Sequence, residues 1–418
     1  MNAPQARDFG SLSSKEVRGC PIPFFKNLLS EAPVYRDPGT GHYIVTRYAD
    51  VIQICNQPRL FLNQADIMIG RAKSPVAAEV QKRFRERGFP ELHTLSTADH
   101  PNHPRFRGMV DKVFTPTFVK GVEPKIRKIA DDLIDAFVDR GSVDVANEFA
   151  NLLPMFVIVD KLGLPRDDWK KIRRWSDVIM ERNDPVLSGE RELELTEEVI
   201  EMQNYLHENL ERFRREPQDC LLSAIANVED EQGRLTDAEA VSISFQIMVG
   251  GNETSATAIL SAVYEVLQRP DMKAKLLADP LLIPSFVEEV LRMHSPVPVL
   301  FRLAAEDTEV AGVPIARGST IVLSWMGANL DPGKWGNPDE FDIARKGLRS
   351  HLTFGRGAHF CLGHLLAKAE LRTALERLLT RLPNMRLSAD YPAPQYVSHA
   401  FVHLLDSLHL EFDRPSAS

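Results

Sequence analysis

The chain has 418 residues, of which 44% are hydrophobic and 26% are charged, a composition typical of a globular protein with enough apolar residues for a large core. Its 50 Lys and Arg residues against 58 Asp and Glu residues give a formal net charge of −8, which gives no electrostatic support to a nucleic-acid-binding function. The four cysteines lack any Cys-x-x-Cys spacing, which argues against a disulfide framework and against a zinc site.

The first 30 residues contain no apolar run long enough for a signal peptide or a membrane anchor, because Pro23, Lys26 and Asn27 interrupt the longest candidate. We therefore expect a cytoplasmic protein without a membrane anchor. No linker rich in Gly, Ser or Pro divides the chain, so we expect one continuous domain over residues 1–418.

Helical periodicity dominates the chain from Pro104 to Leu291, whereas short strand-like runs lie elsewhere. The strand-like runs cover residues 42–48, 307–315, 320–325 and 403–412. This pattern predicts an α+β fold that is mostly α. Two lobes are expected, a β-rich lobe mainly from residues 1–60, 295–350 and 385–418, and a helical lobe mainly from residues 100–295 and 361–383. We expect the polar stretch 228–237 to be a loop between helices.

Two adjacent glycines interrupt an otherwise apolar helical pattern over residues 239–267. Glycine in a helix interior costs about 0.5–1 kcal/mol relative to alanine, so Gly250 and Gly251 indicate a local widening of the helix or the close approach of another group. An acid and an alcohol, Glu253 and Thr254, follow them. Such a pair can hold water and deliver protons, although the glycines are equally compatible with close helix packing and solvent-facing polar side chains.

A single cysteine lies among three glycines in the run Phe-Gly-Arg-Gly-Ala-His-Phe-Cys-Leu-Gly, residues 354–363, directly before a helical pattern over residues 362–379. The thiolate form of cysteine ligates metals, and the N-terminus of a helix favours it. The glycines let the backbone approach a flat macrocycle and point N–H groups at the sulfur. The run is typical of a haem-thiolate loop, and the alternative is a glycine-rich turn with a buried cysteine.

The run from Phe354 to Gly363 meets in full the Phe-Gly-x-Gly-x-His-x-Cys-x-Gly signature of the cytochrome P450 family, which the chain resembles over nearly its whole length. The resemblance implies a single cytochrome P450 domain, haem b as the cofactor and Cys361 as the axial ligand of the haem iron. Residues 250–255 resemble the family's Ala/Gly-Gly-x-Asp/Glu-Thr-Thr/Ser pattern. This match implies catalytic roles in oxygen activation, in which Thr254 relays protons that Glu253 supplies.

The resemblance also implies residues that bind the haem propionates. Residues 99–107 resemble the family's Asp-x-x-x-His-x-x-x-Arg pattern, which assigns His103 and Arg107 to the propionates, and arginine suits bidentate carboxylate binding. Two further candidates by resemblance are Arg302 and His359. His100 and His103 alternatively suggest a metal pair, but no third ligand lies at a sensible spacing.

Glu289 and Arg292 are three residues apart, a spacing found on many ordinary helices. They match the family's Glu-x-x-Arg pair, and the resemblance implies Arg345 as their partner. We expect these three residues to form a buried structural network that fixes the cysteine loop, because breaking such a network leaves a buried charge unpaired.

Apolar residues in the segments that line the family's substrate pocket predict a small lipophilic substrate. The pocket candidates by resemblance are Ile247, Gly250, Val297, Leu300 and Phe401, together with Ile67, Met68, Ile69 and Val299. The same residues are equally compatible with the core. Terpenoid, steroid, fatty and aromatic compounds all stay open as substrates.

The chain shows no Gly-x-Gly-x-x-Gly dinucleotide fingerprint, so its electrons are expected to come from a ferredoxin or flavodoxin with an NAD(P)H-dependent reductase. Basic residues proposed to dock this partner are Arg105, Lys112, Arg349 and Arg356. The leading interpretation is a monooxygenase that inserts one atom of O2 into its substrate. The alternatives are a peroxide-driven peroxygenase and a haem-thiolate sensor or ligand-binding protein without turnover. The Glu253–Thr254 pair favours the monooxygenase.

Overall fold

The computed structural model of the chain describes residues 8–64, 74–182, 187–398 and 402–414. These residues form two compact units. The strand-rich unit comprises Met1–Asn63, Thr257–Cys361 and Arg386–Leu410, and the helical unit comprises Gln64–Ala256, Leu362–Met385 and Glu411–Ser418.

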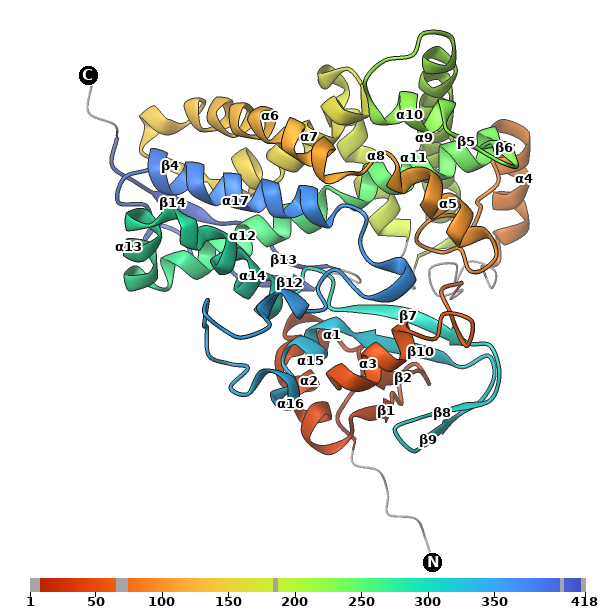
Figure 1. The fold of residues 1–418 in the computed structure, drawn as a ribbon, viewed down its shortest axis with the longest axis horizontal. Coiled ribbons are helices and arrows are strands. Elements are labelled where there is room, and N and C mark those ends of the chain that lie inside the picture. The colour runs from red at the N-terminus through yellow and green to blue at the C-terminus, as the bar shows by residue number, and fades with distance from the viewer. Residues whose placement is uncertain (1–7, 65–73, 183–186, 399–401, 415–418) are drawn as a thin grey trace, which may run out of the picture. The chain divides into compact units, whose positions relative to one another are not determined.

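The helical unit is built mainly from long helices (Figure 1). Its helices are α4 (Ala77–Arg87), α5 (Asn102–Asp111), α6 (Pro116–Asp135), α7 (Leu152–Leu162), α8 (Trp169–Arg182), α9 (Gly189–Arg215), α10 (Leu221–Asn227), α11 (Asp237–Gly250) and α17 (His364–Arg381). Its shorter elements are β4 (Ser142–Asp144), β5 (Glu229–Asp230), β6 (Gly233–Arg234), the 3-10 turns η2 (Val138–Arg140) and η4 (Arg166–Asp168), and the π-turn η3 (Ala146–Ala150).

The helices of this unit form where apolar residues recur at helical spacing. The long helix α9 buries Leu195, Val199, Leu206 and Leu210 on one face, which is the three-to-four-residue periodicity of an amphipathic helix. These residues join a hydrophobic cluster that also takes in side chains of α8, α10 and α11. The same cluster includes buried side chains of α4, α5 and α7, so the core of the helical unit lies among these seven helices.

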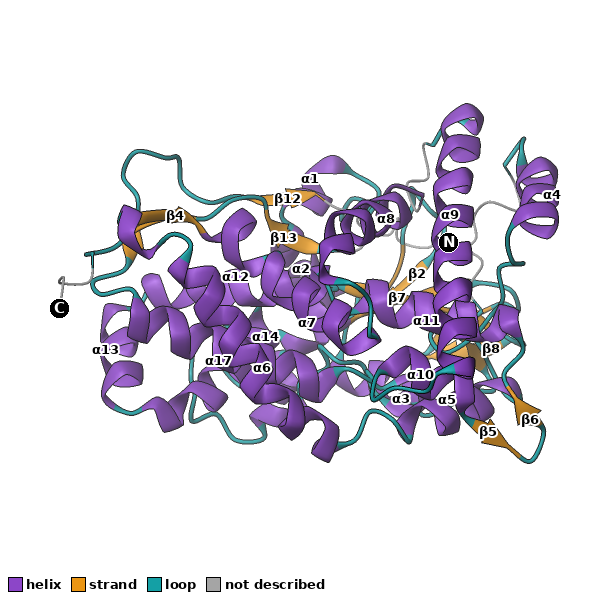
Figure 2. Ribbon diagram, turned by 90° about the horizontal axis from the view of Figure 1, so that it is seen from above, coloured by secondary structure: helices purple, strands orange, loops and turns teal. Residues whose placement is uncertain are grey.

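Helix α17, which follows the cysteine loop, lies beside α6 in both views of the molecule (Figures 1 and 2). Ion pairs join the two helices, with Arg377 Nε 2.7 Å from Asp131 Oδ1 and a two-pronged contact between Arg127 and Glu376. Buried residues such as Leu375 and Leu378 lie on α17. The helix that follows the cysteine loop is therefore fixed to α6 by these ion pairs.

The strand-rich unit contains a five-stranded sheet in the order β1-β2-β10-β7-β3. Strands β10 and β2 pair in parallel, and the other neighbours are antiparallel. The strands of the sheet are β1 (Val34–Arg36), β2 (Tyr43–Val45), β3 (Phe61–Leu62), β7 (Val299–Ala304) and β10 (Thr320–Ser324). The remaining strands are β8 (Thr308–Val310), β9 (Val313–Ile315), β11 (Arg386–Leu387), β12 (Tyr396–Ser398), β13 (His403–Leu405) and β14 (His409–Glu411), whose last residue belongs to the helical unit.

Helices complete the strand-rich unit. They are α1 (Lys15–Gly19), α2 (Pro21–Glu31), α3 (Tyr48–Cys55), α13 (Pro270–Ala278), α14 (Ile283–Met293), α15 (Trp325–Asn329) and α16 (Pro332–Trp335), with the 3-10 turns η5 (Pro280–Leu282), η6 (Leu348–Ser350) and η7 (Gly357–His359). Helix α12 (Glu253–Leu267) starts in the helical unit and continues into the strand-rich unit at Thr257.

The predicted α+β class with a large excess of helix is confirmed. One local expectation is wrong, because the stretch 228–237 is a small hairpin of β5 and β6 rather than a plain loop. The hairpin forms because Gly233 adopts a φ of +94°, which suits a tight turn. Across the described part of the chain, the structure contains no helix with the length and apolar character needed to cross a bilayer.

Candidate functional site

The cysteine loop is closed by its own backbone within the strand-rich unit. The N–H of Cys361 donates to the carbonyl of Phe354 over 2.9 Å, and the N–H of Gly355 donates to the carbonyl of Leu352 over 2.8 Å. Cys361 is partly buried and is not part of a disulfide. Helix α17 begins at His364 with Gly363 as its N-cap, two residues after the start of the predicted helical pattern at residue 362, so Cys361 lies before the helix and does not open it. The Cys361 N–H belongs to the closed loop, whereas the Ala367 N–H donates to the carbonyl of the N-cap Gly363 over 2.9 Å.

Two of the loop glycines differ in their surroundings. A Cβ atom at Gly357 would lie 2.5 Å from the carbonyl oxygen of Cys55 at the end of α3, and Gly357 has a φ of +77°. Gly355 has a φ of +70°, but a Cβ there would meet nothing closer than 3.8 Å. Only Gly357 combines a left-handed backbone with a close backbone contact, so α3 is the support against which the loop packs.

Arg302 lies on β7 and is buried, with 6% exposure. Its Nη1 donates to the carbonyl of Phe301 over 2.7 Å. Burial raises the pKa of the Cys55 thiol, whereas the charges of Arg302 and Arg356 lower it. The charges of Arg302 and Arg356 therefore both act on Cys55 at the C-terminal end of α3, against which the loop packs. His359, the last residue of η7, is partly buried.

Glu289, Arg292 and Arg345 come together in the strand-rich unit. Arg292 is fully buried and donates to both carboxylate oxygens of Glu289 over 2.7 and 2.8 Å. Arg345 Nε donates to Glu289 Oε1 over 3.2 Å. Arg292 also donates to the carbonyls of Asn329 and Pro338 over 2.8 and 2.9 Å. The carboxylate and both guanidinium groups are thus paired, as buried charges require.

The glycine pair ends one helix and precedes the next. Helix α11 ends at Gly250 and α12 begins at Glu253. The Thr254 hydroxyl donates to the carbonyl of Gly250 over 3.0 Å. The Asn252 side chain donates to the carbonyl of Met248 over 3.1 Å. Side chains therefore satisfy carbonyls that the break removes from the helical hydrogen-bond ladder.

Glu253 has the electrostatics of a proton-transfer group. Burial raises the pKa of its carboxyl to about 7, the charge of Asp177 adds to this, and Arg173 opposes it. Its Oε2 atom is buried and has no hydrogen-bond partner among the described residues. A carboxyl with a pKa near neutrality can both accept and release a proton.

His103 and Arg107 lie on α5 in the helical unit. His103 is 5% exposed, and burial first and the charge of Arg107 second lower the pKa of its imidazole, so the two side chains act on each other as their spacing predicts. Arg107 Nε lies 2.7 Å from Asp111 Oδ1. The expectation that Arg105 is available to a docking partner is wrong, because this largely buried arginine pairs with Asp230 and Glu239 over 3.0 and 3.1 Å.

The predicted pocket residues fall into different environments. Ile247 is buried in the core cluster of the helical unit, whereas Gly250 is exposed. Val297 packs against a core cluster of the strand-rich unit, Val299 is 8% exposed and Leu300 is 37% exposed. Phe401 and residues 67–69 lie outside the described residues.

Comparison with known proteins identifies the family. The family model "Cytochrome P450" matches residues 128–384. Cytochrome P450 107B1 of Saccharopolyspora erythraea is 35% identical over 368 residues, which cover 86% of this chain and 87% of that protein. The chain belongs to the cytochrome P450 family. It is therefore a haem-thiolate monooxygenase, the activity that the sequence predicts.

The names of two further relatives of this P450 say what those proteins act on or bind. The 6-deoxyerythronolide B hydroxylase of the same organism is 37% identical over 310 residues, which cover 72% of this chain and 75% of that protein. The structure of P450BioI in complex with an acyl carrier protein ligated to hexadec-9Z-enoic acid has a TM-score of 0.86 and 28% identity. The structural match covers 96% of this chain and 100% of the P450BioI chain.

The residues of this P450 fit a haem group by their chemistry. Cys361 supplies a thiol that is not part of a disulfide, on a closed loop, and a cysteine thiolate is a ligand for haem iron. Propionates require cations or hydrogen-bond donors. The strand-rich unit offers buried Arg302 and partly buried His359, and the helical unit offers His103 and Arg107.

Glu370 is a buried acid that the sequence analysis missed. It lies on α17 with 2% exposure, and burial raises the pKa of its carboxyl to about 8, while a hydrogen bond with Ser255 opposes this. The sequence contains a signal for this burial. The apolar residues Leu366 and Ala374 lie four residues before and four residues after Glu370 on the same helical face, and both are buried. This periodicity places Glu370 on the buried stripe of α17.

The raised pKa of Glu370 makes stability fall as pH rises. The folded protein keeps this proton up to about pH 8, whereas an unfolded glutamate releases it near pH 4.5, so folding loses about 1 kcal/mol per pH unit between these values. A Glu370→Gln variant removes the proton but keeps the shape. We expect wild type and variant to be similar near pH 5 and the variant to be more stable above pH 8. Urea unfolding across this pH range measures the difference, and parallel curves would contradict the assignment.

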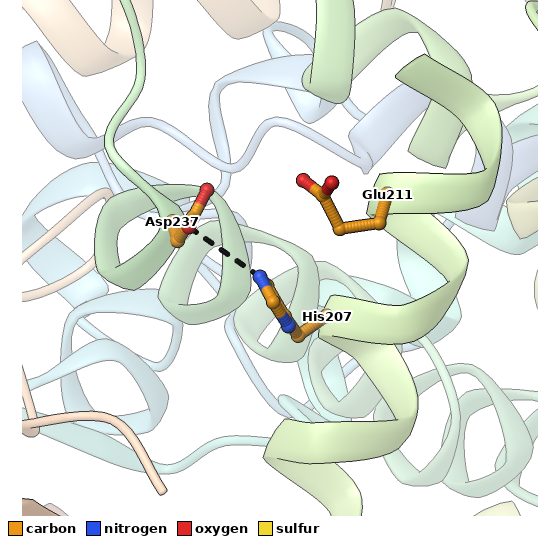
Figure 3. A group of neighbouring side chains, drawn as sticks. All are labelled: His207, Glu211 and Asp237. Carbon is orange, nitrogen blue, oxygen red and sulfur yellow. Dashed lines mark ion pairs between the residues drawn. The ribbon is translucent and has the colours of Figure 1, made fainter. Parts of the chain in front are cut away.

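A separate polar group on the helical unit has the side-chain types of a metal site (Figure 3). His207 and Glu211 of α9 and Asp237 of α11 place ligand atoms within 4.8 Å of one another. Arg214, however, already pairs with Glu211 and with Asp237, the latter over 2.6 Å. A metal ion would have to displace this cation, so we interpret the group as a charge cluster that joins α9 to α11.

Proposed function

We propose that this P450 uses O2 to hydroxylate or epoxidise a small lipophilic compound, with haem b as its cofactor and electrons from a separate ferredoxin or flavodoxin and its NAD(P)H-dependent reductase. The observation that carries the proposal is the Glu253–Thr254 pair at the break between α11 and α12. One oxygen atom enters the substrate and the other leaves as water, so each turnover consumes two electrons and two protons. A carboxyl with a pKa of about 7 beside an ordered hydroxyl is suited to deliver those protons.

The chain's own residues have distinct proposed roles. Cys361 holds the haem iron, which supplies the redox chemistry when the group is bound. His103, Arg107, Arg302 and His359 bind the propionates. The Thr254 hydroxyl, fixed by its hydrogen bond to the Gly250 carbonyl, keeps its oxygen lone pairs available to accept a proton.

Further proposed roles concern structure and substrate. The backbone before the cysteine loop is held by Glu289, Arg292 and Arg345. We also propose that both units belong to one P450 domain. The substrate contacts Ile247, Gly250, Val297, Leu300 and Phe401. The cytoplasmic location stays a prediction.

The names of relatives support a lipophilic substrate without identifying it. One relative is a hydroxylase of 6-deoxyerythronolide B, and another binds hexadec-9Z-enoic acid on an acyl carrier protein. Apolar Val297 and Val299 of this chain are compatible with such compounds. Lys112 and Arg356 are exposed cations and are the basic residues we propose for docking an acidic redox partner.

The test begins with an optical titration of the ferric protein with terpenoids, steroids, fatty acids and aromatic acids. A compound that displaces water from the iron changes the spin state and so reveals the substrate class. Compounds that bind are then incubated with a surrogate ferredoxin, its reductase and NADPH, or with hydrogen peroxide alone. Product only with peroxide would support a peroxygenase, and binding without product in either case would support a sensor or ligand-binding protein.

A Thr254→Ala variant should uncouple the enzyme. Reductant is still consumed, but the yield of product per NADPH falls by about tenfold or more, since a positioned proton-transfer group typically contributes 10²–10⁴-fold. Most of the reductant should then appear as hydrogen peroxide. Thr254→Ser retains a hydroxyl and is the control. Measurement of product, NADPH and peroxide together gives the coupling, and an unchanged yield in Thr254→Ala would remove this role from Thr254.

A further inference from the structure

One buried asparagine contacts both the Glu289–Arg292 pair and the segment that precedes the cysteine loop. Asn329 is the last residue of α15 and is fully buried. Its backbone carbonyl accepts a hydrogen bond from Arg292 Nη1 over 2.8 Å. Its side-chain Oδ1 accepts from the backbone N–H of Leu352 over 2.7 Å. All of these residues belong to the strand-rich unit, so Asn329 joins the buried ion pair to the start of the loop within that unit.

The amide nitrogen of Asn329 makes the remaining contacts of this side chain. Nδ2 donates to Ser295 Oγ over 2.9 Å and to Thr353 Oγ1 over 3.0 Å. Because the Leu352 N–H can only donate, the side-chain atom that faces it must be the oxygen, and the other arm of the amide must be the nitrogen. The amide therefore uses its oxygen and both of its N–H groups, and these partners fix it in one orientation.

Thr353 connects the same segment to a second helix and to the cysteine loop. Its hydroxyl accepts from the asparagine and donates to the carbonyl of Leu291 on α14 over 2.5 Å. The next residue is Phe354, whose carbonyl accepts the N–H of Cys361 over 2.9 Å. The two residues that the asparagine holds, Leu352 and Thr353, are therefore followed directly by the residue that is hydrogen-bonded to Cys361.

We propose that Asn329 is a positioning residue that fixes the Cys361 ligand by holding the start of the cysteine loop against α14 and α15. The inference rests on the proposed role of Cys361 as the ligand of the haem iron. The groups that hold a metal ligand set its orientation and the stability of its bond to the metal. An apolar side chain in place of Asn329 would leave the buried Leu352 N–H without its acceptor, and such an unsatisfied group is costly. The segment would then move, and the ligand with it.

An Asn329→Leu variant tests the proposal, because leucine has a similar shape but forms no side-chain hydrogen bonds. Thr353→Val removes only the hydroxyl between Asn329 and α14. Thr46→Val is the matched control, since the Thr46 hydroxyl is buried in the same unit and also donates to a backbone carbonyl, that of Pro33, over 3.2 Å. In hydrogen–deuterium exchange of the haem-loaded protein, we expect the Leu352 amide to exchange about tenfold faster in Asn329→Leu and at the wild-type rate in Thr46→Val.

The second readout separates a positioning role from a general contribution to stability. The ferrous carbon monoxide complex of each variant is followed in urea, with thiolate ligation measured by its absorbance and helix content by circular dichroism. At urea concentrations below the loss of helix, we expect the ratio of thiolate-ligated to displaced haem to be about tenfold lower than in wild type in Asn329→Leu and about fivefold lower in Thr353→Val. Thr353→Ser retains the hydroxyl and should retain the wild-type ratio, and Thr46→Val should leave the ratio unchanged.

Either of two results would overturn the inference. Wild-type exchange of the Leu352 amide in Asn329→Leu would show that the asparagine does not hold this segment. Loss of thiolate ligation only together with helix content, in both Asn329→Leu and Thr353→Val, would show a general effect on stability. If Asn329→Leu does not fold, Thr353→Val and Thr353→Ser decide between the same outcomes. Failure of the proposed role of Cys361 is distinguishable, because the wild-type protein itself would then lack the thiolate spectrum, whereas the exchange of the Leu352 amide would still respond to Asn329→Leu.

Discussion

Replacing Arg292 with methionine should lower the apparent free energy of unfolding by about 3–5 kcal/mol, the range for breaking a buried ion pair by removal of one partner. Arg292 is fully buried and donates to Glu289 and to the carbonyls of Asn329 and Pro338. Methionine fills much of the space but leaves these acceptors short of donors, and Arg345 is then the cation that stays beside Glu289. Urea unfolding of the haem-loaded protein, followed by circular dichroism and by haem absorbance, measures the loss.

An exposed arginine pair provides the control for this prediction. Arg127 forms a two-pronged contact with Glu376, but its side chain is 45% exposed. An exposed pair contributes at most about 1 kcal/mol, so Arg127→Met should have a small effect. Equal losses in the two variants would contradict a special structural role for Arg292.

A Gly357→Ala variant should bind haem with incorrect ligation or lose it altogether. The new Cβ would lie 2.5 Å from the Cys55 carbonyl, and φ is +77°, so the loop has to move away from α3. Cys361 lies on the same closed loop and has to move with it. The spectrum of the ferrous carbon monoxide complex distinguishes thiolate ligation from its loss. We expect less than about a tenth of the protein to keep thiolate ligation, since a shift of 1.4 kcal/mol already changes an equilibrium tenfold.

Gly355→Ala separates the steric clash from backbone strain. Gly355 has a similar φ of +70°, but a Cβ there meets no atom within 3.8 Å. Its substitution should cost only the left-handed strain of about 1–2 kcal/mol, so a clearly larger fraction of the protein should keep thiolate ligation than in Gly357→Ala, which carries the same strain and the clash as well. Equal loss of ligation in both variants would mean that the contact with Cys55 is unimportant.

The features that could be predicted from the sequence are those that depend on close spacing along the chain. Two adjacent glycines predict a local irregularity at Gly250 and Gly251, where α11 ends, and apolar periodicity predicts the helix at 364–381. The strands near 320–325 and 403–412 follow from short apolar runs. The exact start of α17 at His364 could not be predicted, because the helical pattern already begins at residue 362 and the N-cap Gly363 has no side chain that marks the start.

The interactions that could not be predicted join residues that lie far apart in the chain. No pattern of neighbouring residues shows that Arg105 pairs with Asp230 or that Gly357 packs on Cys55. The same holds for His294, which lies between Glu265 and Tyr396. Such pairs form only when folding brings distant segments together and removes water from them, which also raises the pKa of Glu253 and Glu370.

The sequence by itself determined the family, the haem-thiolate chemistry and the mostly helical class of this protein. Each of these depends on a motif or a periodicity that spans a few neighbouring residues. Only the tertiary structure decided which charges are buried, which glycine is sterically required and which distant side chains form hydrogen bonds with one another. The physical reason is that desolvation and packing depend on three-dimensional neighbours, and a linear pattern does not specify them.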